Sequence, residues 1–315
     1  MEYLNVVAGL VLLVVAGEML IRSSVSLALW LNVSTLVIGL TVVSFATSAP
    51  ELLVSLQAAM NGHPDISVGN VVGSNIANIG LILGLTALIK RLPVMDRGYR
   101  FDWVIMVVVT LLFYLFVIWD DRLNGWEGGV LVMMIIGYNV YKIRGSRKAR
   151  NADVMEKEIQ ESYVKRPLWM VFLLLLIGIV GLRYGAQFLV DGASEIALQL
   201  GVGERVISLT IVAFGTSVPE LAASLIAARK GETDLAVGNI IGSNIFNITS
   251  VLGLSSMIID IPLTSPEFLT FDYWWMLGFS LLLGVPIFFF TSKYLGKRLG
   301  GLFLGGYILY FYFLL

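Results

Sequence analysis

The chain alternates long apolar stretches with short turns that carry glycine, asparagine, proline or charged residues. Ten of the apolar stretches approach the roughly 20 residues that an α-helix needs to cross the hydrocarbon core of a bilayer. The pattern therefore predicts an all-α integral membrane protein with ten transmembrane helices. The predicted spans are residues 3–24, 34–59, 66–89, 101–118, 126–143, 167–189, 205–228, 235–258, 270–291 and 299–315.

The composition agrees with a membrane protein and excludes several kinds of site. Hydrophobic residues make up 57% of the chain and charged residues 14%, whereas a soluble domain has about a quarter charged residues. The chain has no cysteine, which excludes disulfides and thiolate metal sites, and its single histidine, His63, excludes an imidazole cluster. A formal net charge of -1 gives no sign of a nucleic-acid partner, and we expect none. The amino-terminal stretch lacks the features of a signal peptide, so we interpret it as a retained first span.

The positions of Lys and Arg predict the orientation in the membrane. If the N-terminus lies outside, eighteen of the 21 basic residues fall on the inner side, as the excess of positive charge in cytoplasmic loops requires. We therefore expect a plasma (inner) membrane protein with both termini outside and the polar stretch 142–166 in the cytoplasm. Arg183 falls within the sixth span, and we interpret it as snorkelling outward. We further expect a functional monomer in the lipid bilayer.

The two halves of the chain repeat each other at a shift of 169 residues, the distance between Glu51 and Glu220. DISVGNVVGSNIANI and DLAVGNIIGSNIFNI share ten identities in fifteen positions. We predict a first five-helix repeat at 1–141, a linker at 142–166 and a second repeat at 167–315. Because five spans is an odd number, the second repeat enters the membrane from the opposite side. Inverted repeats of this kind are typical of secondary transporters, whose substrate site lies between the repeats near the bilayer midplane.

Each half contains one stretch in which a proline and a glutamate stand among apolar residues, SFATSAPELLVS and AFGTSVPELAAS. Proline removes a helical hydrogen bond, so Pro50 and Pro219 each leave a backbone carbonyl without its usual donor. Such carbonyls are tolerated within a membrane only where they meet protein, water or an ion. A carboxylate at membrane depth is functional by default. Glu51 and Glu220 are therefore the first candidates for an ion site.

Further oxygen donors gather on the same predicted helix faces. Residues four apart share a face, so Thr47 projects beside Glu51 and Ser74 beside Asn78. A site made wholly of oxygens suits a hard cation, and Ca²⁺ takes about 6–8 oxygen ligands in flexible geometry, whereas Mg²⁺ fits less well. Two ionised glutamates balance one divalent charge and repel each other when the site is empty, which favours Na⁺ or a proton as the replacement. The predicted side-chain ligands are Ser44, Thr47, Ser48, Glu51, Ser74, Asn78, Thr216, Ser217, Glu220, Ser243 and Asn247.

The paired segments SFATSAPE and AFGTSVPE, followed by GNVVGSNIANI and GNIIGSNIFNI, resemble the two α-repeats of the Na⁺/Ca²⁺ exchangers. This family belongs to the cation/Ca²⁺ antiporter superfamily, and the resemblance extends over the ten-span layout. It implies ion ligands at the positions named above, together with backbone oxygens near Ser44 and Ala213. It also implies that the long first and sixth spans, here residues 3–31 and 167–199, slide across an eight-helix core to switch access between the two sides.

Two positions depart from the pattern of the family. Ala46 stands where the second repeat has Gly215 and the family usually has glycine, a change that a helix tolerates. Asn247 stands where several prokaryotic and K⁺-dependent relatives carry aspartate, which leaves two carboxylates and weakens the case for K⁺ co-transport. The Ca²⁺/H⁺ branch typically carries its acid in a GNxxE pattern, so GNVVG and GNIIG favour the Na⁺ branch.

We therefore expect a secondary active antiporter that exchanges Na⁺ for Ca²⁺ by alternating access, without a cofactor. The alternative is a Ca²⁺/H⁺ antiporter that uses the same glutamates as proton carriers. A cation channel is disfavoured because channels usually assemble their filters from several subunits, whereas this chain builds a two-fold site within itself. An enzyme is disfavoured because no nucleophile, metal-binding histidine or cofactor motif accompanies the glutamates.

Overall fold

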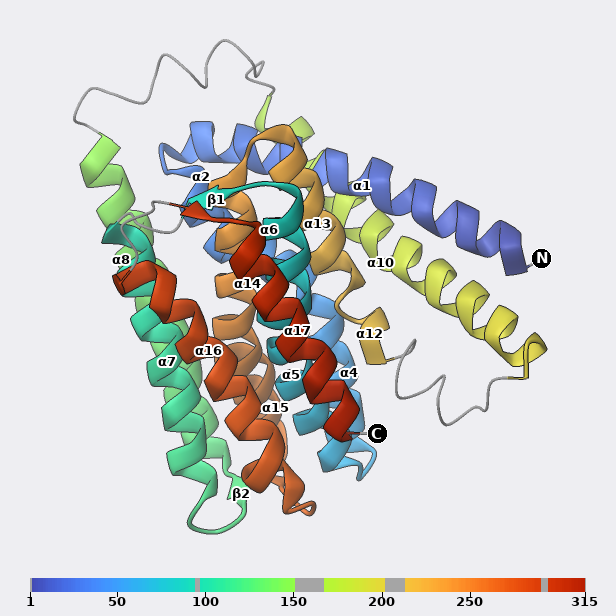
Figure 1. Cartoon of the computed structure of the whole chain (residues 1–315). Coiled ribbons are helices and arrows are strands. Elements are labelled where there is room, and N and C mark those ends of the chain that lie inside the picture. Colours follow the sequence, from blue (N-terminus) through green and yellow to red (C-terminus); the bar gives the residue numbers. More distant parts are fainter. Residues whose placement is uncertain (1, 94–96, 151–166, 202–212, 290–293, 315) are drawn as a thin grey trace.

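The computed structural model describes residues 2–93, 97–150, 167–201, 213–289 and 294–314 (Figure 1). Each predicted span is helical where it is described. The first half contains α1 (Glu2–Leu31), α2 (Thr35–Ile38), η1 (Gly39–Val43), α3 (Ser44–Thr47), α4 (Ala49–Met60), α5 (Pro64–Ala77), η2 (Asn78–Leu83), α6 (Gly84–Ile89), β1 (Leu92–Pro93), α7 (Arg97–Val117), β2 (Arg122–Leu123) and α8 (Gly125–Arg150). The second half contains α10 (Leu168–Gln199), α12 (Ala213–Gly215), α13 (Val218–Lys230), α14 (Thr233–Phe246), η4 (Asn247–Leu252), α15 (Gly253–Ile258), β3 (Ile261–Pro262), η5 (Phe268–Asp272), α16 (Tyr273–Phe289), β4 (Tyr294–Leu295) and α17 (Lys297–Leu314).

The helices have the lengths and compositions of a membrane protein. Among the described residues, six helices are long and apolar enough to cross a membrane, or seven if the bent pair Thr35–Thr47 and Ala49–Met60 is one span. The remaining predicted spans correspond to α8, to α17 and to the segment that includes α13, of which residues 205–212 lie outside the described part. The predicted class, an all-helical membrane protein, is confirmed.

The two long helices α1 and α10 lie side by side along one flank of the bundle (Figure 1). They span 30 and 32 residues, as expected for the long first and sixth spans. Glycines let their backbones approach closely, since a methyl group at Gly9 would lie 2.7 Å from the backbone nitrogen of Leu189. At the far end of the contact, a methyl group at Gly192 would lie 2.7 Å from the carbonyl oxygen of Glu2. The pair therefore forms a closely packed unit.

The continuous helix formed by α14, η4 and α15 runs through the centre of the bundle (Figure 1), and its most apolar 18-residue window is completely buried. It packs directly against the second span of the first half. A methyl group at Gly238 would lie 2.7 Å from the carbonyl oxygen of Leu36, and one at Gly242 would lie 2.7 Å from that of Leu40. The two halves are thus interleaved, and the third helix of one half lies against the second helix of the other.

The spans that contain Pro50 and Pro219 are each broken next to their glutamate. In the first half, α3 ends at Thr47, α4 begins at Ala49, and the two parts are bent by 44°. The break follows from Pro50, which has no N–H to donate to the preceding turn. In the second half, α13 begins at Val218, one residue before Pro219. The sequence predicted a lost hydrogen bond at each proline, and in the structure a new helix begins just before each carboxylate.

Two short antiparallel ribbons join the halves outside the helices. Strand β1 pairs with β4, so that the end of the third span is tied to the beginning of the last. Strand β2 pairs with β3 at the opposite end of the bundle (Figure 1). These ribbons fix the ends of helices that lie far apart in the sequence.

A buried ion pair joins α7 to α8 at Lys142, the first residue of the predicted linker. The Lys142 ammonium lies 2.8 Å from Asp102, and Tyr138 donates a 2.9 Å hydrogen bond to the same carboxylate. The side chains of Lys142 and Asp102 are 9% and 0% exposed. The sequence places Lys142 at the start of the polar linker, but α8 continues to Arg150. A lysine after an apolar stretch resembles a loop residue unless its buried partner is known.

Removing one partner of this pair is expected to destabilise the fold. Lys142→Met leaves the Asp102 carboxylate buried without its cation, a change that costs about 3–5 kcal/mol. Adding Asp102→Asn to this variant removes the uncompensated charge and should restore most of the loss. Thermal unfolding of the purified proteins in detergent, followed by tryptophan fluorescence, measures both effects. Arg144→Met, an exposed position two residues along α8, is the control, and an equal loss in that variant would contradict a specific ion pair.

Candidate cation site

The two intramembrane glutamates occupy equivalent places in the fold. Glu51 lies in the first turn of α4 and Glu220 in the first turn of α13, and both are almost completely buried. The amino terminus of a helix carries partial positive charge, which favours a carboxylate there. Ser48, three residues before Glu51, donates a hydrogen bond to Glu220. The broken helices thus bring two carboxylates of separate repeats to one buried region.

Few groups donate hydrogen bonds to the two carboxylates. The Ser48 hydroxyl donates a 3.0 Å hydrogen bond to Oε1 of Glu220, and thereby crosses from the first repeat to the second. Within the described residues, Oε2 of Glu220 and both carboxylate oxygens of Glu51 have no partner. In the equivalent position of the second repeat, Ser217 donates instead to the Ser74 hydroxyl, at 3.3 Å. The two equivalent serines therefore make different contacts: Ser48 donates to a glutamate of the other repeat, whereas Ser217 donates to a serine of the other repeat.

A pair of asparagines clamps the broken helices, and these residues are absent from the predicted ligand set. Asn70 donates to the carbonyl of Glu51 (3.3 Å) and to the hydroxyl of Ser55 (2.9 Å). Its side-chain oxygen accepts a 3.4 Å hydrogen bond from Thr216 of the other repeat. Asn70 thus joins the backbone at the glutamate of its own repeat to a hydroxyl of the other repeat.

The second repeat makes the same clamp with Asn239. This residue donates to the carbonyl of Glu220 (3.5 Å) and to Ser224 (3.0 Å), and accepts a 3.2 Å hydrogen bond from Thr47. The duplicated GN dipeptide in the sequence marks both asparagines. Their hydrogen-bond partners could not be assigned without knowing which helices face each other. Bonds of this kind link the repeats reciprocally and satisfy polar groups that burial would otherwise penalise.

Four more asparagines form a hydrogen-bonded chain at the interface of the repeats. Asn75 and Asn244 each donate to the other's backbone carbonyl, at 3.2 and 3.3 Å. Asn78 donates to Oδ1 of Asn244 at 2.9 Å, and Asn247 donates to Oδ1 of Asn75 at 3.1 Å. With their amide nitrogens engaged in this way, Asn78 and Asn247 keep side-chain oxygens without a partner among the described residues.

The helices that carry these asparagines change from α-helix to π-helix at the predicted ligands Asn78 and Asn247. The π-helical segments η2 and η4 begin at Asn78 and Asn247 respectively. Such π-bulges are rare and frequently occur at functional sites. Their duplication at equivalent positions indicates that the local backbone geometry is part of the same two-fold arrangement as the glutamates.

The remaining predicted positions are engaged mainly in local contacts. The Ser44 hydroxyl donates to the carbonyl of Leu40 at 2.8 Å, and the Ser44 carbonyl accepts a 2.9 Å hydrogen bond from the Ser48 amide. Ser243 is buried, and its hydroxyl has no partner in the described part of the chain. Ala213 begins α12, but its side chain lies outside the described residues.

The chemistry of the unpartnered atoms fits a cation. Buried polar atoms normally have a hydrogen-bond partner, and those that can only accept are the ones that a metal ion satisfies. Ca²⁺ takes about 6–8 oxygens, so a set of this size matches its requirement. Within the described residues, the predicted ligands contribute six buried oxygens without partners: Oε1 and Oε2 of Glu51, Oε2 of Glu220, Oδ1 of Asn78, Oδ1 of Asn247 and Oγ of Ser243.

A cleft of about 210 Å³ lies beside the two helix breaks. Pro50, Thr216 and Pro219 line it on one side. Arg183, Gln187 and Asp191 of α10 line the other side. This differs from the interpretation that Arg183 snorkels outward, because the sequence alone does not reveal which face of α10 meets the broken helices. The cleft places charged side chains of α10 next to the region of the glutamates.

Replacing an asparagine of the clamp is expected to weaken both stability and ion binding. Asn239→Ala removes the buried hydrogen bonds that this side chain makes with Thr47, Ser224 and the Glu220 carbonyl, and loss of a buried partner costs about 1–3 kcal/mol. Thermal unfolding measures the first effect, and the Ca²⁺ concentration needed to stabilise the protein measures the second. Asn61→Ala, at an exposed position, is the matched control. A variant that unfolds and binds Ca²⁺ like the control would contradict the clamp.

Comparison with known proteins places this geometry among transporters. A family model described as "Sodium/calcium exchanger protein" matches residues 2–144 and 170–315, one segment in each half. The putative antiporter CaxA of Alkalimonas amylolytica is 43% identical over 254 residues, which cover 80% of this chain and 79% of that protein. The inner membrane protein YrbG of Escherichia coli K12 is 34% identical over 307 residues, covering 96% of this chain and 94% of the relative.

The fold is also similar to a solved structure. The sodium-calcium exchanger NCX_Mj, in crystals soaked with zero Na⁺ and Ca²⁺, superposes with a TM-score of 0.84 and 32% sequence identity. The match covers 99% of this chain and 98% of NCX_Mj. The similarity therefore extends over both repeats and includes the helices that carry the glutamates.

Proposed function

The chain belongs to the sodium/calcium exchanger family, and we propose that it is a secondary active antiporter that exchanges Na⁺ for Ca²⁺ across a membrane. The observation that carries this proposal is the pair of buried carboxylates, Glu51 and Glu220, beside side-chain oxygens that lack hydrogen-bond partners. Hard cations require such oxygens, and two carboxylates balance one divalent charge. The proposed substrates are Ca²⁺ and Na⁺, and the proposed ligands are the residues predicted from the sequence.

Repulsion between the glutamates explains why such a site exchanges ions instead of releasing them freely. Two carboxylates that are brought together in a buried region disfavour the doubly ionised state unless a cation lies between them. The protein therefore switches access between the two sides of the membrane with Ca²⁺ or with replacement cations bound. The two repeats contribute equivalent oxygens from opposite orientations, so one site between them can serve both sides of the membrane.

We infer that α1 and α10 move together to switch access to the site. Their long backbones contact each other through glycines, and α10 forms one wall of the cleft beside the helix breaks. Glu18 of α1 forms a 2.8 Å ion pair with Lys230 at the end of α13, with Glu18 40% exposed. A partly exposed pair of this kind contributes little stability, so it permits sliding against the remaining helices.

The proposed arrangement in the membrane follows from the same symmetry. We infer repeats at 1–141 and 167–315, joined by a linker at 142–166 whose first residues continue α8. The end of α13 and the beginning of α17, both basic, lie with β1 toward the top of Figure 1, opposite β2. We place this basic face in the cytoplasm and both termini outside, in a plasma (inner) membrane. A monomer contains both halves of the site and suffices for transport.

Neutralising either glutamate is expected to abolish Ca²⁺ transport. Glu51→Gln and Glu220→Gln keep the size of the side chain but remove one of the two charges that balance Ca²⁺. Replacing residues that merely support metal ligands costs about 10–100-fold, so the loss should exceed 100-fold for a ligand. Uptake of radioactive Ca²⁺ into proteoliposomes measures the effect.

The matched control is Glu267→Gln, the same chemical change at an exposed position. This variant should transport at the rate of the unaltered protein. Unfolding temperatures of all three variants separate loss of function from loss of fold. Transport at the unaltered rate by a folded Glu51→Gln or Glu220→Gln protein would exclude the proposed site.

A further inference from the structure

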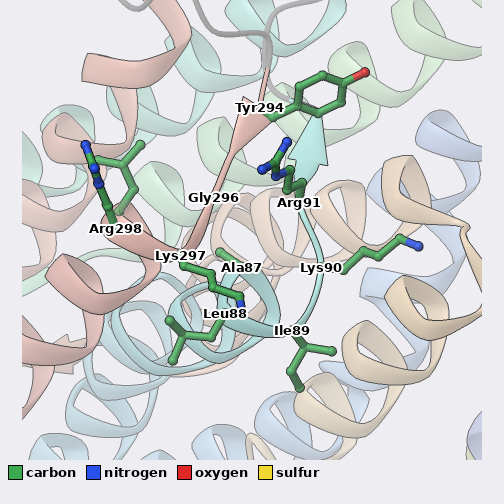
Figure 2. A pocket seen from close by; sticks show the side chains of 10 residues that line it. Ala87, Leu88, Ile89, Lys90, Arg91, Tyr294, Gly296, Lys297 and Arg298 are labelled. Carbon is green, nitrogen blue, oxygen red and sulfur yellow. The ribbon is translucent and has the colours of Figure 1, made fainter.

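A basic pocket of about 930 Å³ opens where α6 ends and α17 begins (Figure 2). Each half of the chain contributes two exposed basic side chains to it. These are Lys90 and Arg91, which follow α6, and Lys297 and Arg298, which begin α17. The described residues that line the pocket include no acidic residue, and none of the four cations forms an ion pair with a residue that the structure describes. The pocket therefore concentrates positive charge.

The backbone around the pocket holds these charges in place. Leu92 and Leu295, each next to the pocket, face each other in the β1–β4 ribbon and are completely buried. Below the ribbon, α6 and α17 touch closely, since a methyl group at Gly300 would lie 2.7 Å from the carbonyl oxygen of Gly84. Figure 2 shows Arg91 and Lys297 near the middle of the pocket, and Lys90 and Arg298 at its two sides. The spacing of the cations is thus set by contacts between the two halves.

The walls of the pocket combine this charge with apolar surface. Leu88, Ile89 and Leu299 line it, and the Ile89 side chain is 48% exposed. Further along α17, Leu302 is 52% exposed on the membrane-spanning part of the helix. A free inorganic anion gains nothing from apolar walls. A ligand that fits both parts has a negative group at one end and hydrocarbon at the other.

We propose that this pocket binds the phosphate of an anionic phospholipid, with the acyl chains along Ile89 and the outer face of α17. Arginine offers phosphate paired N–H donors in a fixed geometry, and lysine adds a compact charge. Basic pockets between transmembrane helices on the cytoplasmic side suit such headgroups. This site is separate from the cation site of the proposed function and does not depend on it.

The test is a binding titration of the purified full-length protein in neutral detergent. The probes are short-chain phosphatidylglycerol, short-chain phosphatidylcholine and inorganic phosphate, with binding followed by isothermal titration calorimetry. Phosphatidylglycerol is expected to bind at one saturable site and the other two probes much more weakly. Arg91→Gln with Lys297→Gln should weaken phosphatidylglycerol binding about 25-fold, roughly fivefold for each basic residue removed near a membrane surface.

Two comparisons make the result decisive. Arg144→Gln with Lys148→Gln removes the same charge from exposed positions of α8 outside the pocket, and should leave the affinity unchanged. Arg91→Lys with Lys297→Arg keeps the charge and should retain most of the binding, which separates charge from folding. Equal weakening in the α8 variant would overturn the pocket as the site. Inorganic phosphate binding as tightly as phosphatidylglycerol would overturn the lipid as the ligand.

Discussion

The structure depends on the cost of burying two like charges in an apolar bundle. A carboxylate without a partner is strongly disfavoured inside a protein or a membrane, yet Glu51 and Glu220 are both buried and have little hydrogen bonding. A bound cation would relieve the cost of burying the two carboxylates, and loss of the cation would restore that cost. Under the proposed function, the site therefore requires a bound cation, and exchange of one cation for another is the process that it favours.

The surrounding architecture keeps these two carboxylates available. Proline breaks place each glutamate in the first turn of a new helix, while Asn70 and Asn239 hold the backbone at the breaks and bind a threonine of the opposite repeat. The hydrogen-bonded chain of Asn75, Asn78, Asn244 and Asn247 engages the amide nitrogens of Asn78 and Asn247 and leaves their side-chain oxygens without a partner among the described residues. We propose that the oxygens left without partners at this interface are the ones that bind the ion.

Much of this arrangement could be predicted because it follows from local rules. The thickness of the bilayer fixes the length of a span, and the missing N–H of Pro50 fixes the break beside Glu51. Contacts between distant segments could not be predicted in the same way. Asn70 meets a residue of the other repeat, Lys142 is buried only because Asp102 faces it, and the side of α10 that carries Arg183 depends on helix packing. A single sequence contains the donors and acceptors but not their pairing.

The most direct test of the account compares Ca²⁺ uptake by reconstituted protein under two gradients. One set of proteoliposomes is loaded with Na⁺, and a second carries only a pH gradient. The account predicts that uptake requires internal Na⁺ and disappears when the Na⁺ gradient is collapsed. Uptake driven by the pH gradient alone would contradict Na⁺ coupling and assign the glutamates to proton exchange, and Ca²⁺ flux that ignores both gradients would contradict exchange altogether.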